Sequence, residues 1–302
     1  MSVDFFVVGA ARSGTTSIYN YLSVHPQVFL PKVKECNFFS DVESMDYEAY
    51  EPLDPDKQYH MKIIKSQEVY DSLFKNVSED LLKGDVSPSY LWDKKTAKKI
   101  YEYNPKAKII ISLRNPIERA FSHYLMHFNT GYEKQKPFES AISAKKIEIW
   151  GGGNLYLEMG LYYEQVKTYI EYFGKENVKI IIYEDWILDI KNSINEVYNF
   201  LDIESFNDVE LNTKHNETVV LKNGTVMNFL RKKKIKKVLN KILPEEFREK
   251  FKKSFFNDNN AEKECLQPET YERLVNYYQS DIVKLEKLLD VTLSEKWQIS
   301  ND

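Results

Sequence analysis

The sequence predicts an α/β fold in which a central parallel sheet is flanked by helices. Two short apolar runs, residues 4–9 and 108–113, have the length and composition of buried strands, and the second contains three consecutive isoleucines. Each run is followed by apolar residues at helical spacing. Because strands that alternate with helices form βαβ units, we expect the strands to lie parallel in one sheet.

The same alternation continues along the chain. Pro88 ends a strand near residues 84–87, and Pro116 stands in the first turn of a helix, where proline is favoured. No repeat or low-complexity linker interrupts the chain, so we expect a single domain over residues 1–302. The expected strands are 4–9, near 84–87, 108–113 and 178–183; the expected helices are 15–24, 94–103, 116–128, 161–173, 190–201 and 268–289, with a basic helical segment at about 225–256 and a C-terminal helical region at about 268–298.

Composition excludes several classes of protein. The 302 residues carry a formal net charge of −4, and their 42 aromatic side chains supply enough core material to exclude intrinsic disorder. Cys36 and Cys265 form no CxxC pair, which excludes a zinc ribbon and a disulfide scaffold, and free thiols suit a reducing compartment. No apolar run reaches the ~20 residues of a membrane-spanning helix, and the N-terminus lacks a signal-peptide pattern. We therefore expect a cytoplasmic location.

The segment Gly9–Thr16 joins the first strand to the first helix and has the glycine spacing of a phosphate-binding loop. Backbone N–H groups in such a loop attract anions, and the N-terminus of the following helix adds partial positive charge. Thr15 stands where the Walker pattern GxxxxGK[ST] has its lysine, which contacts the β- and γ-phosphates of a nucleotide. With Arg12 inside the loop, the segment predicts a phosphate site that is poorly suited to NTP hydrolysis.

A second candidate anion site follows the strand at 108–113. Arg114 lies at the C-terminal end of this strand, where open α/β sheets bind ligands. Its guanidinium can form two hydrogen bonds with a phosphate, and Ser122, two helical turns further on, can add a hydroxyl from the same side. Arg119 is expected to form a surface ion pair, as mid-helix arginines usually do.

These two segments carry a family resemblance. Arg12–Ser17 after an apolar strand, followed in order by Arg114–Ser122, is similar to the two cofactor signatures of sulfotransferases that use 3′-phosphoadenosine 5′-phosphosulfate (PAPS). The similarity is greatest to the branch that contains heparan sulfate sulfotransferase domains and their bacterial relatives. It extends weakly to Gly160–Tyr163, Ile182–Asp185 and Leu285–Trp297. The resemblance implies a three-layer P-loop-like fold and transfer of a sulfuryl group from PAPS to an acceptor hydroxyl, in this branch on a carbohydrate.

The resemblance also implies roles for residues of the two signatures. Relatives usually have lysine at the position of Arg12; arginine keeps the charge but does not donate a proton, so we expect it to stabilise the leaving phosphate electrostatically. No metal ion is implied. The residues that would bind the 5′-phosphosulfate are Arg12, Ser13, Gly14, Thr15, Thr16 and Ser17, and those that would bind the 3′-phosphate are Arg114 and Ser122.

A candidate general base lies in the segment Lys34–Phe39, which resembles the Lys-Glu…Phe-Phe segment of the family. In the family, the glutamate of this segment is the proposed base for the acceptor hydroxyl, and here it is Glu35. The flanking lysines favour its ionised form, which a base needs. Val86 departs from the family, since relatives often have a lysine at this position. Asp85 beside it is the second choice for the base.

Histidines and a cysteine offer further candidates. His123 and His127 lie one helical turn apart, a spacing that suits a metal ion, but no third ligand is near them in sequence. A histidine base also stays open, because other sulfotransferase branches use one. His25 precedes a proline and is expected to be structural. Cys36 has no recognisable Cys-His signature beside it.

Two other classes of function stay open at this point. A kinase or NTPase with a degenerate Walker loop would need an aspartate at a strand end to hold Mg²⁺, and none can be placed from the sequence. A non-catalytic nucleotide-binding or glycan-binding module would share the phosphate loop but not the base.

The segment 231–253 is strongly basic, with eleven Lys or Arg residues, three Glu residues and a formal charge of +8. Apolar residues recur within it at helical spacing, so the lysines are expected to face outward. The segment is either a solvated helix face or a surface for an anionic glycan or an anionic membrane. We do not expect nucleic acid as a partner, because no recognition motif accompanies the charge.

Overall fold

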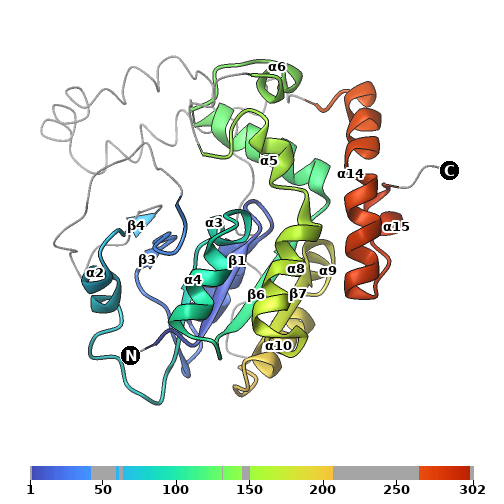
Figure 1. Cartoon of the computed structure of the whole chain (residues 1–302). Coiled ribbons are helices and arrows are strands. Elements are labelled where there is room, and N and C mark those ends of the chain that lie inside the picture. Colours follow the sequence, from blue (N-terminus) through green and yellow to red (C-terminus); the bar gives the residue numbers. More distant parts are fainter. Residues whose placement is uncertain are drawn as a thin grey trace, which may run out of the picture.

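The computed structural model describes residues 2–41, 59–60, 64–130, 132–144, 150–206 and 265–299. Its centre is a five-stranded parallel sheet with the strand order β2-β5-β1-β6-β7 (Figure 1). The strands of this sheet are β1 (Phe5–Gly9), β2 (Val28–Phe29), β5 (Leu82–Val86), β6 (Lys108–Leu113) and β7 (Val178–Ile182). A separate parallel pair consists of β3 (Val33–Lys34) and β4 (Tyr59–His60).

Helices connect the strands, and the helix α5 (Pro116–Asn129) illustrates how the sequence starts them. The Asn115 side chain accepts a hydrogen bond from the Ile117 N–H at 2.9 Å, and Pro116 occupies the first helical position. The other helices are α1 (Thr15–Ser23), α2 (Gln67–Ser72), α3 (Ser89–Trp92), α4 (Thr96–Tyr103), α6 (Phe138–Ile142), α7 (Leu155–Glu158), α8 (Tyr162–Phe173), the 3₁₀ turn η1 (Lys175–Asn177), α9 (Tyr183–Leu188), α10 (Ile190–Phe200), α14 (Pro268–Leu289) and α15 (Ser294–Trp297).

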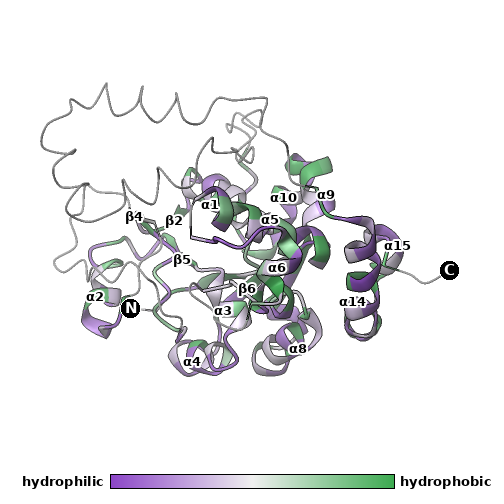
Figure 2. Cartoon of the chain, turned by 90° about the horizontal axis from the view of Figure 1, so that it is seen from above, coloured by the Kyte–Doolittle hydropathy of each residue, from purple (hydrophilic) through white to green (hydrophobic). Residues whose placement is uncertain are grey.

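Each face of the sheet is covered by its own helical layer, because successive side chains of a strand point to opposite faces. Phe5 and Val7 of β1 belong to one apolar cluster with residues of α1, α9 and α10. Phe6 and Val8 belong to the other, with residues of α3, α4, α5, α8 and α14. Figure 2 shows α1, α9 and α10 on one side of the strands and α3, α4 and α8 on the other. The alternation within one strand therefore generates both cores.

The carboxyl ends of the parallel strands meet at one edge of the sheet. Strand β1 pairs with β5 and with β6, so that Phe5 lies opposite Gly84 on one side and Lys108 on the other. Gly84 is required here, because a Cβ at this position would lie 2.2 Å from the Phe5 ring. The loops after β1, β5 and β6 consequently emerge side by side.

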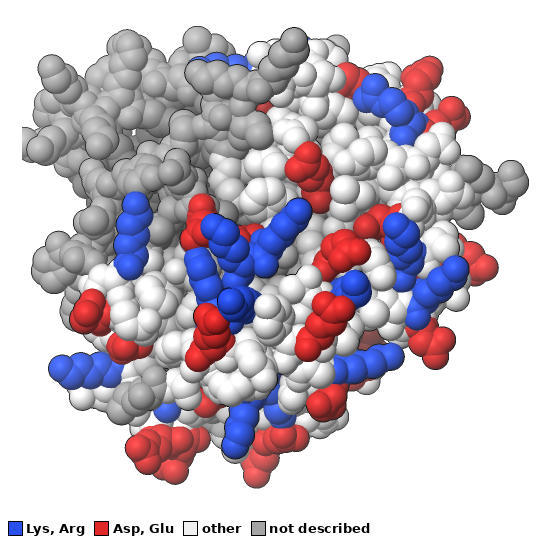
Figure 3. Space-filling view, viewed as in Figure 1, with Lys and Arg blue, Asp and Glu red and all other residues white. Residues whose placement is uncertain are grey.

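Charges of both signs lie on the outer faces of α4 and α8. Lys98 is 3.6 Å from Glu102 in α4, and Lys167 is 3.5 Å from Glu171 in α8. Figure 3 shows basic and acidic side chains interspersed over the face in view. Exposed pairs of this kind contribute only a few tenths of a kcal/mol each, so the two apolar cores determine the stability of the fold.

The predicted α/β class and its central parallel sheet are confirmed. Each predicted strand and helix in the described residues has a counterpart, including the helix Pro268–Leu289 with its predicted bounds. The sequence did not predict the short elements β2, β3, β4, α2, α3, α6, α7, η1 and α9. The expected basic helical segment at 225–256 lies outside the described residues.

No helix in the described part of the chain has the length and apolar character needed to cross a membrane. Cys36 is buried and Cys265 is exposed. The cytoplasmic location stays a prediction.

Candidate functional site at the carboxyl edge of the sheet

The phosphate loop, defined here as residues 9–14, is attached to the neighbouring strand β6. The Ala10 N–H donates to the Ser112 carbonyl oxygen at 2.7 Å, and the Ser112 hydroxyl donates to the Ser13 carbonyl oxygen at 2.5 Å. Gly14 has φ +81°, and a Cβ there would lie 2.9 Å from the Tyr183 ring. The left-handed conformation and the close approach both require glycine at this position.

Helix α1 begins directly after the loop and contains no acidic residue in its first turn. The first N–H groups of a helix have no acceptor within the helix, so this end attracts an anion. The Ser13 hydroxyl is buried and has no hydrogen-bond partner among the described residues. These donors fit a phosphate group.

Arg12 reaches from the loop to helix α5. Its Nε donates to the Ser122 hydroxyl at 3.2 Å, and its Nη1 lies 3.4 Å from the Met126 sulfur, a weak acceptor. Within the described residues Arg12 forms no ion pair. Burial lowers the pKa of Arg12, and the nearby positive charge of Arg114 lowers it further. An arginine stays charged in proteins, so this guanidinium is a partly desolvated cation whose bonds all go to neutral groups.

Arg114 follows β6 and lies beside Arg12. Its Nη1 donates to the Arg12 carbonyl oxygen at 3.4 Å, and its guanidinium lies 4.9 Å from the centre of the Tyr183 ring. The carboxylate of Glu118 is 3.6 Å from its Nη2. The structure thus places Arg12 next to both Arg114 and Ser122, and the assignment of these residues to two phosphate groups stays a prediction.

A set of three residues, the Glu184 cluster (Asn115, Glu184 and Trp297), fixes the chain next to Arg114. One oxygen of Glu184 accepts from the Asn115 N–H and the other from the Trp297 indole N–H, both at 3.0 Å. The Asn115 side chain donates to the Trp297 carbonyl oxygen at 2.8 Å. The C-terminal helix α15 is thereby connected to the turn that carries Arg114.

Glu35 stands at the same edge of the sheet, after β3. Its backbone N–H donates to the Val86 carbonyl oxygen at 3.1 Å, and the carbonyl oxygen of Glu35 accepts a hydrogen bond from the Asn37 side chain at 2.7 Å. Glu35 has φ +61°, a conformation that is uncommon for a residue other than glycine. Its carboxylate forms an ion pair with the buried ammonium of Lys34. The negative charge of Glu35 raises the pKa of Arg12. Burial and the charge of Arg114, which lower that pKa, have larger effects.

Asp85, the alternative base, lies at the centre of a buried polar group, the Asp85 cluster (Cys36, Tyr70, Asp85, Ser87 and Tyr90). Four donors surround the carboxylate: the hydroxyls of Ser87 and Tyr90 at 2.8 Å, that of Tyr70 at 3.0 Å and the Cys36 thiol at 3.2 Å. Burial raises the pKa of Asp85, and these hydrogen bonds oppose that rise. Asp85 is 1% exposed, so its position favours a structural role beneath Glu35.

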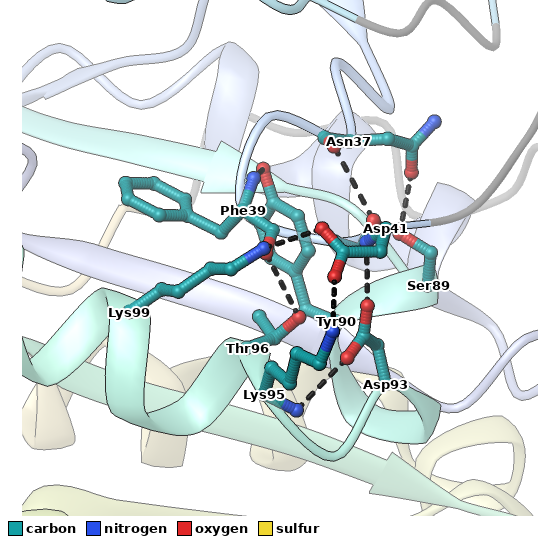
Figure 4. A network of polar contacts seen from close by, with 10 residues as sticks. Asn37, Phe39, Asp41, Ser89, Tyr90, Asp93, Lys95, Thr96 and Lys99 are labelled. Carbon is teal, nitrogen blue, oxygen red and sulfur yellow. Dashed lines mark hydrogen bonds and ion pairs between the residues drawn. The ribbon is translucent and has the colours of Figure 1, made fainter.

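The segment after Glu35 is attached to helices α3 and α4, as Figure 4 shows. The Ser89 hydroxyl donates to the Asn37 side-chain oxygen at 2.6 Å. Asp41 accepts hydrogen bonds from Lys99 at 2.6 Å and Lys95 at 3.1 Å, and these bonds lower the pKa of its carboxyl group. The segment 35–41 therefore contacts the Asp85 cluster through Cys36 and helix α4 through Asp41.

The expectation for Arg119 was wrong. Arg119 is fully buried and forms no ion pair with the described residues. It donates to the Tyr156 carbonyl oxygen and lies 3.4 Å from Nδ1 of His123. Helical spacing within α5 does not reveal that α7 packs over this side of the helix, which is why the sequence indicated a surface position.

The two histidines of α5 are buried in the same region. Burial lowers the pKa of His123 well below its ordinary value, and burial together with the charge of Arg12 lowers the pKa of His127 to about 3. His127 Nδ1 lies 2.9 Å from the Tyr156 hydroxyl. Within the described ranges no three His, Cys, Asp or Glu residues are grouped so that they could hold a metal ion.

His25 and Cys36 have structural surroundings. His25 accepts from the Gln27 N–H at 3.1 Å and lies 2.9 Å from the Glu204 carbonyl oxygen. Burial raises the pKa of the Cys36 thiol well above its ordinary value, followed by the effect of the Asp85 charge, so the thiol is a poor nucleophile.

Sequence reasoning left several residues of this edge without a role. Tyr183, Glu184 and Trp297 appeared only as weak matches, and the structure shows that they contact the turn after β6. Lys34 was noted only as a flanking charge, although it is the ion-pair partner of Glu35. Trp186 donates to the Ser17 hydroxyl at 3.2 Å. Apart from the pair of Lys34 and Glu35, these contacts join residues that are about 70 to 180 positions apart, which local spacing does not report.

A parallel α/β sheet with a phosphate loop and two converging arginines is typical of the class of α/β proteins that bind anionic ligands at the carboxyl edge of the sheet. Within this class, the sulfotransferase domain family matches residues 2–292. The chain therefore belongs to the sulfotransferase family.

Individual relatives agree with this membership. A sulfotransferase structure from Alicyclobacillus acidocaldarius is 27% identical, covers 99% of both chains and has a TM-score of 0.68. Mouse carbohydrate sulfotransferase 15 is 23% identical over 243 residues, which are 66% of this chain and 43% of the relative. Mouse bifunctional heparan sulfate N-deacetylase/N-sulfotransferase 4 is 26% identical over 218 residues, 66% of this chain and 22% of the relative. The chain thus spans less than half the length of these two curated relatives.

Proposed function

We propose that this protein transfers a sulfuryl group from PAPS to a hydroxyl group of a carbohydrate. The observation that carries the proposal is the convergence of Arg12, Arg114 and Ser122 at the end of β1 and β6, next to a loop that lacks the Walker lysine. Membership of the sulfotransferase family supports the reaction class. The carbohydrate acceptor is supported by the names of two relatives, which refer to carbohydrate and to heparan sulfate.

The loop and the start of α1 would bind the 5′-phosphosulfate of PAPS. The Ser13 hydroxyl has no hydrogen-bond partner in the described structure, the first turn of α1 contains no acidic residue, and Arg12 adds a cation. Arg114 and Ser122 would bind the 3′-phosphate. In the structure Ser122 accepts from Arg12, so this hydroxyl stands between the two proposed phosphate positions. The donor set therefore fits a ligand with two separate phosphate groups.

In the proposed reaction PAPS supplies an activated sulfuryl group. The acceptor oxygen forms a bond to sulfur, while the bond between sulfur and the bridging phosphate oxygen breaks and leaves its electron pair on the phosphate. Glu35 receives the acceptor proton as general base. Arg12 and the loop amides stabilise the negative charge that develops on the leaving phosphate.

Binding measurements separate this proposal from a nucleotide triphosphatase. We expect adenosine 3′,5′-bisphosphate, the product nucleotide, to bind in isothermal titration calorimetry without added metal, and ATP with Mg²⁺ to bind more weakly. Normal ATP binding without binding of the bisphosphate, in a folded sample, would contradict the proposal. Transfer of label from ³⁵S-PAPS is then measured to methyl β-D-glucopyranoside, which offers only hydroxyls, and to N-desulfated heparan, which also offers amines.

Glu35→Gln tests the base and excludes a non-catalytic module. The substitution keeps the size of the side chain but removes its ability to take a proton, so kcat should fall on the order of 10²–10⁴-fold while affinity for the bisphosphate is retained. Glu79→Gln, at an exposed position, is the control and should match the wild type. If Glu35→Gln changes KM alone, Glu35 is an acceptor contact and not the base.

The basic segment 231–253 lies outside the described residues, and its contact with an anionic glycan or membrane surface stays a prediction. Reversal of Lys232, Lys233, Lys236 and Lys237 to Glu tests it. We expect a higher acceptor KM or lost binding to anionic liposomes, with unchanged affinity for the bisphosphate. If neither quantity responds to the reversal or to salt, the segment is a solvated surface.

A further inference from the structure

Lys34 is a buried cation beside the proposed base. Its side chain is only 4% exposed, and its ammonium donates to Oε1 of Glu35, whose side chain is 22% exposed. Lysine is almost never buried without a partner, and within the described residues Glu35 is the ion-pair partner of Lys34. The carboxylate of Glu35 therefore supplies the partner that this buried lysine needs.

The backbone fixes both members of this pair. Lys34 lies in β3, opposite His60 of β4, and the next residue, Glu35, donates its N–H to the Val86 carbonyl oxygen. A buried ion pair contributes little net stability after its desolvation cost, and apolar residues serve a core equally well. An ion pair at the edge of the sheet that carries the site thus points to a role in the reaction.

We propose that Lys34 is a positioning residue that orients the carboxylate of Glu35 for proton transfer; this rests on the proposed function of Glu35 as the base. The ammonium holds Oε1, whereas Oε2 has no partner among the described residues. Oε2 is thus the oxygen that receives the acceptor proton.

The pair changes its charge as the proton moves. Before transfer, the negative charge of Glu35 compensates the positive charge of Lys34. Once Glu35 takes the acceptor proton it is neutral, and the charge of Lys34 is left uncompensated next to the reacting group, where the sulfuryl oxygens and the leaving phosphate carry negative charge. An interaction that strengthens in the transition state raises kcat and not only affinity.

Lys34→Met tests the proposal, since methionine fills a similar volume without charge. We expect kcat for transfer from ³⁵S-PAPS to methyl β-D-glucopyranoside, which offers only hydroxyls, to fall roughly 10- to 100-fold, the loss expected from a misplaced reacting group. The dissociation constant of adenosine 3′,5′-bisphosphate should stay within about twofold of the wild type. Lys34→Arg should recover part of kcat. The matched control is Lys75→Met, at an exposed position after α2, which should match the wild type. A kcat of Lys34→Met equal to that of Lys75→Met overturns the proposal.

The double variant Lys34→Met/Glu35→Gln separates a role through Glu35 from an independent one. If Lys34 acts through Glu35, the double variant has the kcat of Glu35→Gln alone, because nothing remains to be oriented. Multiplied losses show that Lys34 acts by itself and overturn the positioning role. Retained activity in Glu35→Gln instead overturns the proposed base, an outcome distinct from a failure of Lys34.

Chemical labelling tests the pairing without turnover and with any variant that folds. With acetic anhydride followed by mass spectrometry, Lys34 should be acetylated much more slowly than Lys32 in the wild type. Glu35→Ala removes the partner and should accelerate labelling of Lys34 while leaving Lys32 unchanged. Equal rates for the two lysines in the wild type contradict the buried pair.

Discussion

Arg12 and Arg114 differ in what surrounds their guanidinium groups. Arg12 bonds only to neutral side chains, whereas Arg114 lies between the Tyr183 ring and the Glu118 carboxylate and donates to the backbone of Arg12. A guanidinium that is held on several sides is preorganised, so less side-chain entropy is lost when a ligand binds.

Arg114→Ala should weaken binding of adenosine 3′,5′-bisphosphate by roughly 1.5–3 kcal/mol, the contribution of a charge-assisted hydrogen bond. Isothermal titration calorimetry measures the change. The control is Arg273→Ala, an exposed arginine of α14, which should bind like the wild type. Unchanged affinity of Arg114→Ala would show that Arg114 is not a phosphate ligand.

Elements far apart in sequence are joined at the site by a single carboxylate. Glu184 follows β7, Asn115 precedes α5 and Trp297 ends α15, and both oxygens of Glu184 are used in connecting them. The C-terminal helix therefore contributes to the geometry of the turn that carries Arg114.

Glu184→Gln replaces one acceptor oxygen with an NH₂ group that faces an N–H donor. We expect the free energy of unfolding in urea to fall by about 1–3 kcal/mol, because a buried donor loses its partner. Affinity for adenosine 3′,5′-bisphosphate should fall as well. Glu102→Gln, which removes only an exposed pair with Lys98 in α4, should change stability by less than ~0.5 kcal/mol. Equal stability of the two variants would contradict the role of the Glu184 cluster.

Patterns within a few residues predicted the helices and strands whose apolar residues recur at a regular spacing. They also predicted the phosphate loop, whose glycines directly follow a strand. The isoleucine run of β6 and the glycine spacing after β1 are signals within a few residues, so the sheet and the phosphate loop were found. The burial of Arg119 and the contacts of Glu184 depend on packing between distant helices, which no spacing within α5 or α9 encodes. For Lys34, the sequence predicted only a positive charge beside Glu35. It did not predict a buried ion pair, because the burial of a lysine is not visible in sequence.

For the whole molecule, the buried histidines predict that stability depends on pH. In the folded state the pKa of His127 is about 3 instead of 6.5, and that of His123 is also lowered, chiefly by burial. At pH values between about 3 and 6.5, the unfolded chain therefore binds more protons at His127 than the folded chain does. The free energy of unfolding therefore falls as pH falls below 6.5, by about 2 kcal/mol at pH 5 for His127 alone.

Urea unfolding at pH 7 and pH 5 measures this dependence. In His127→Gln the loss of stability between the two pH values should be about 2 kcal/mol smaller than in the wild type, since the carboxylates contribute equally to both. The same loss in both proteins would show that His127 is not held neutral by burial.

Because β1 pairs directly with β6, the geometry of the proposed PAPS-binding part of the site does not depend on how many residues separate its two motifs. Arg12 and Ser122 are 110 positions apart, yet their separation is set by adjacent strands. Insertions or deletions in the connections should leave that separation intact, so acceptor-recognition segments can diverge around an unchanged nucleotide site. A slip of β1 by one residue against β6 would instead displace the loop by about 3.3 Å, as much as the whole length of the Arg12–Ser122 hydrogen bond.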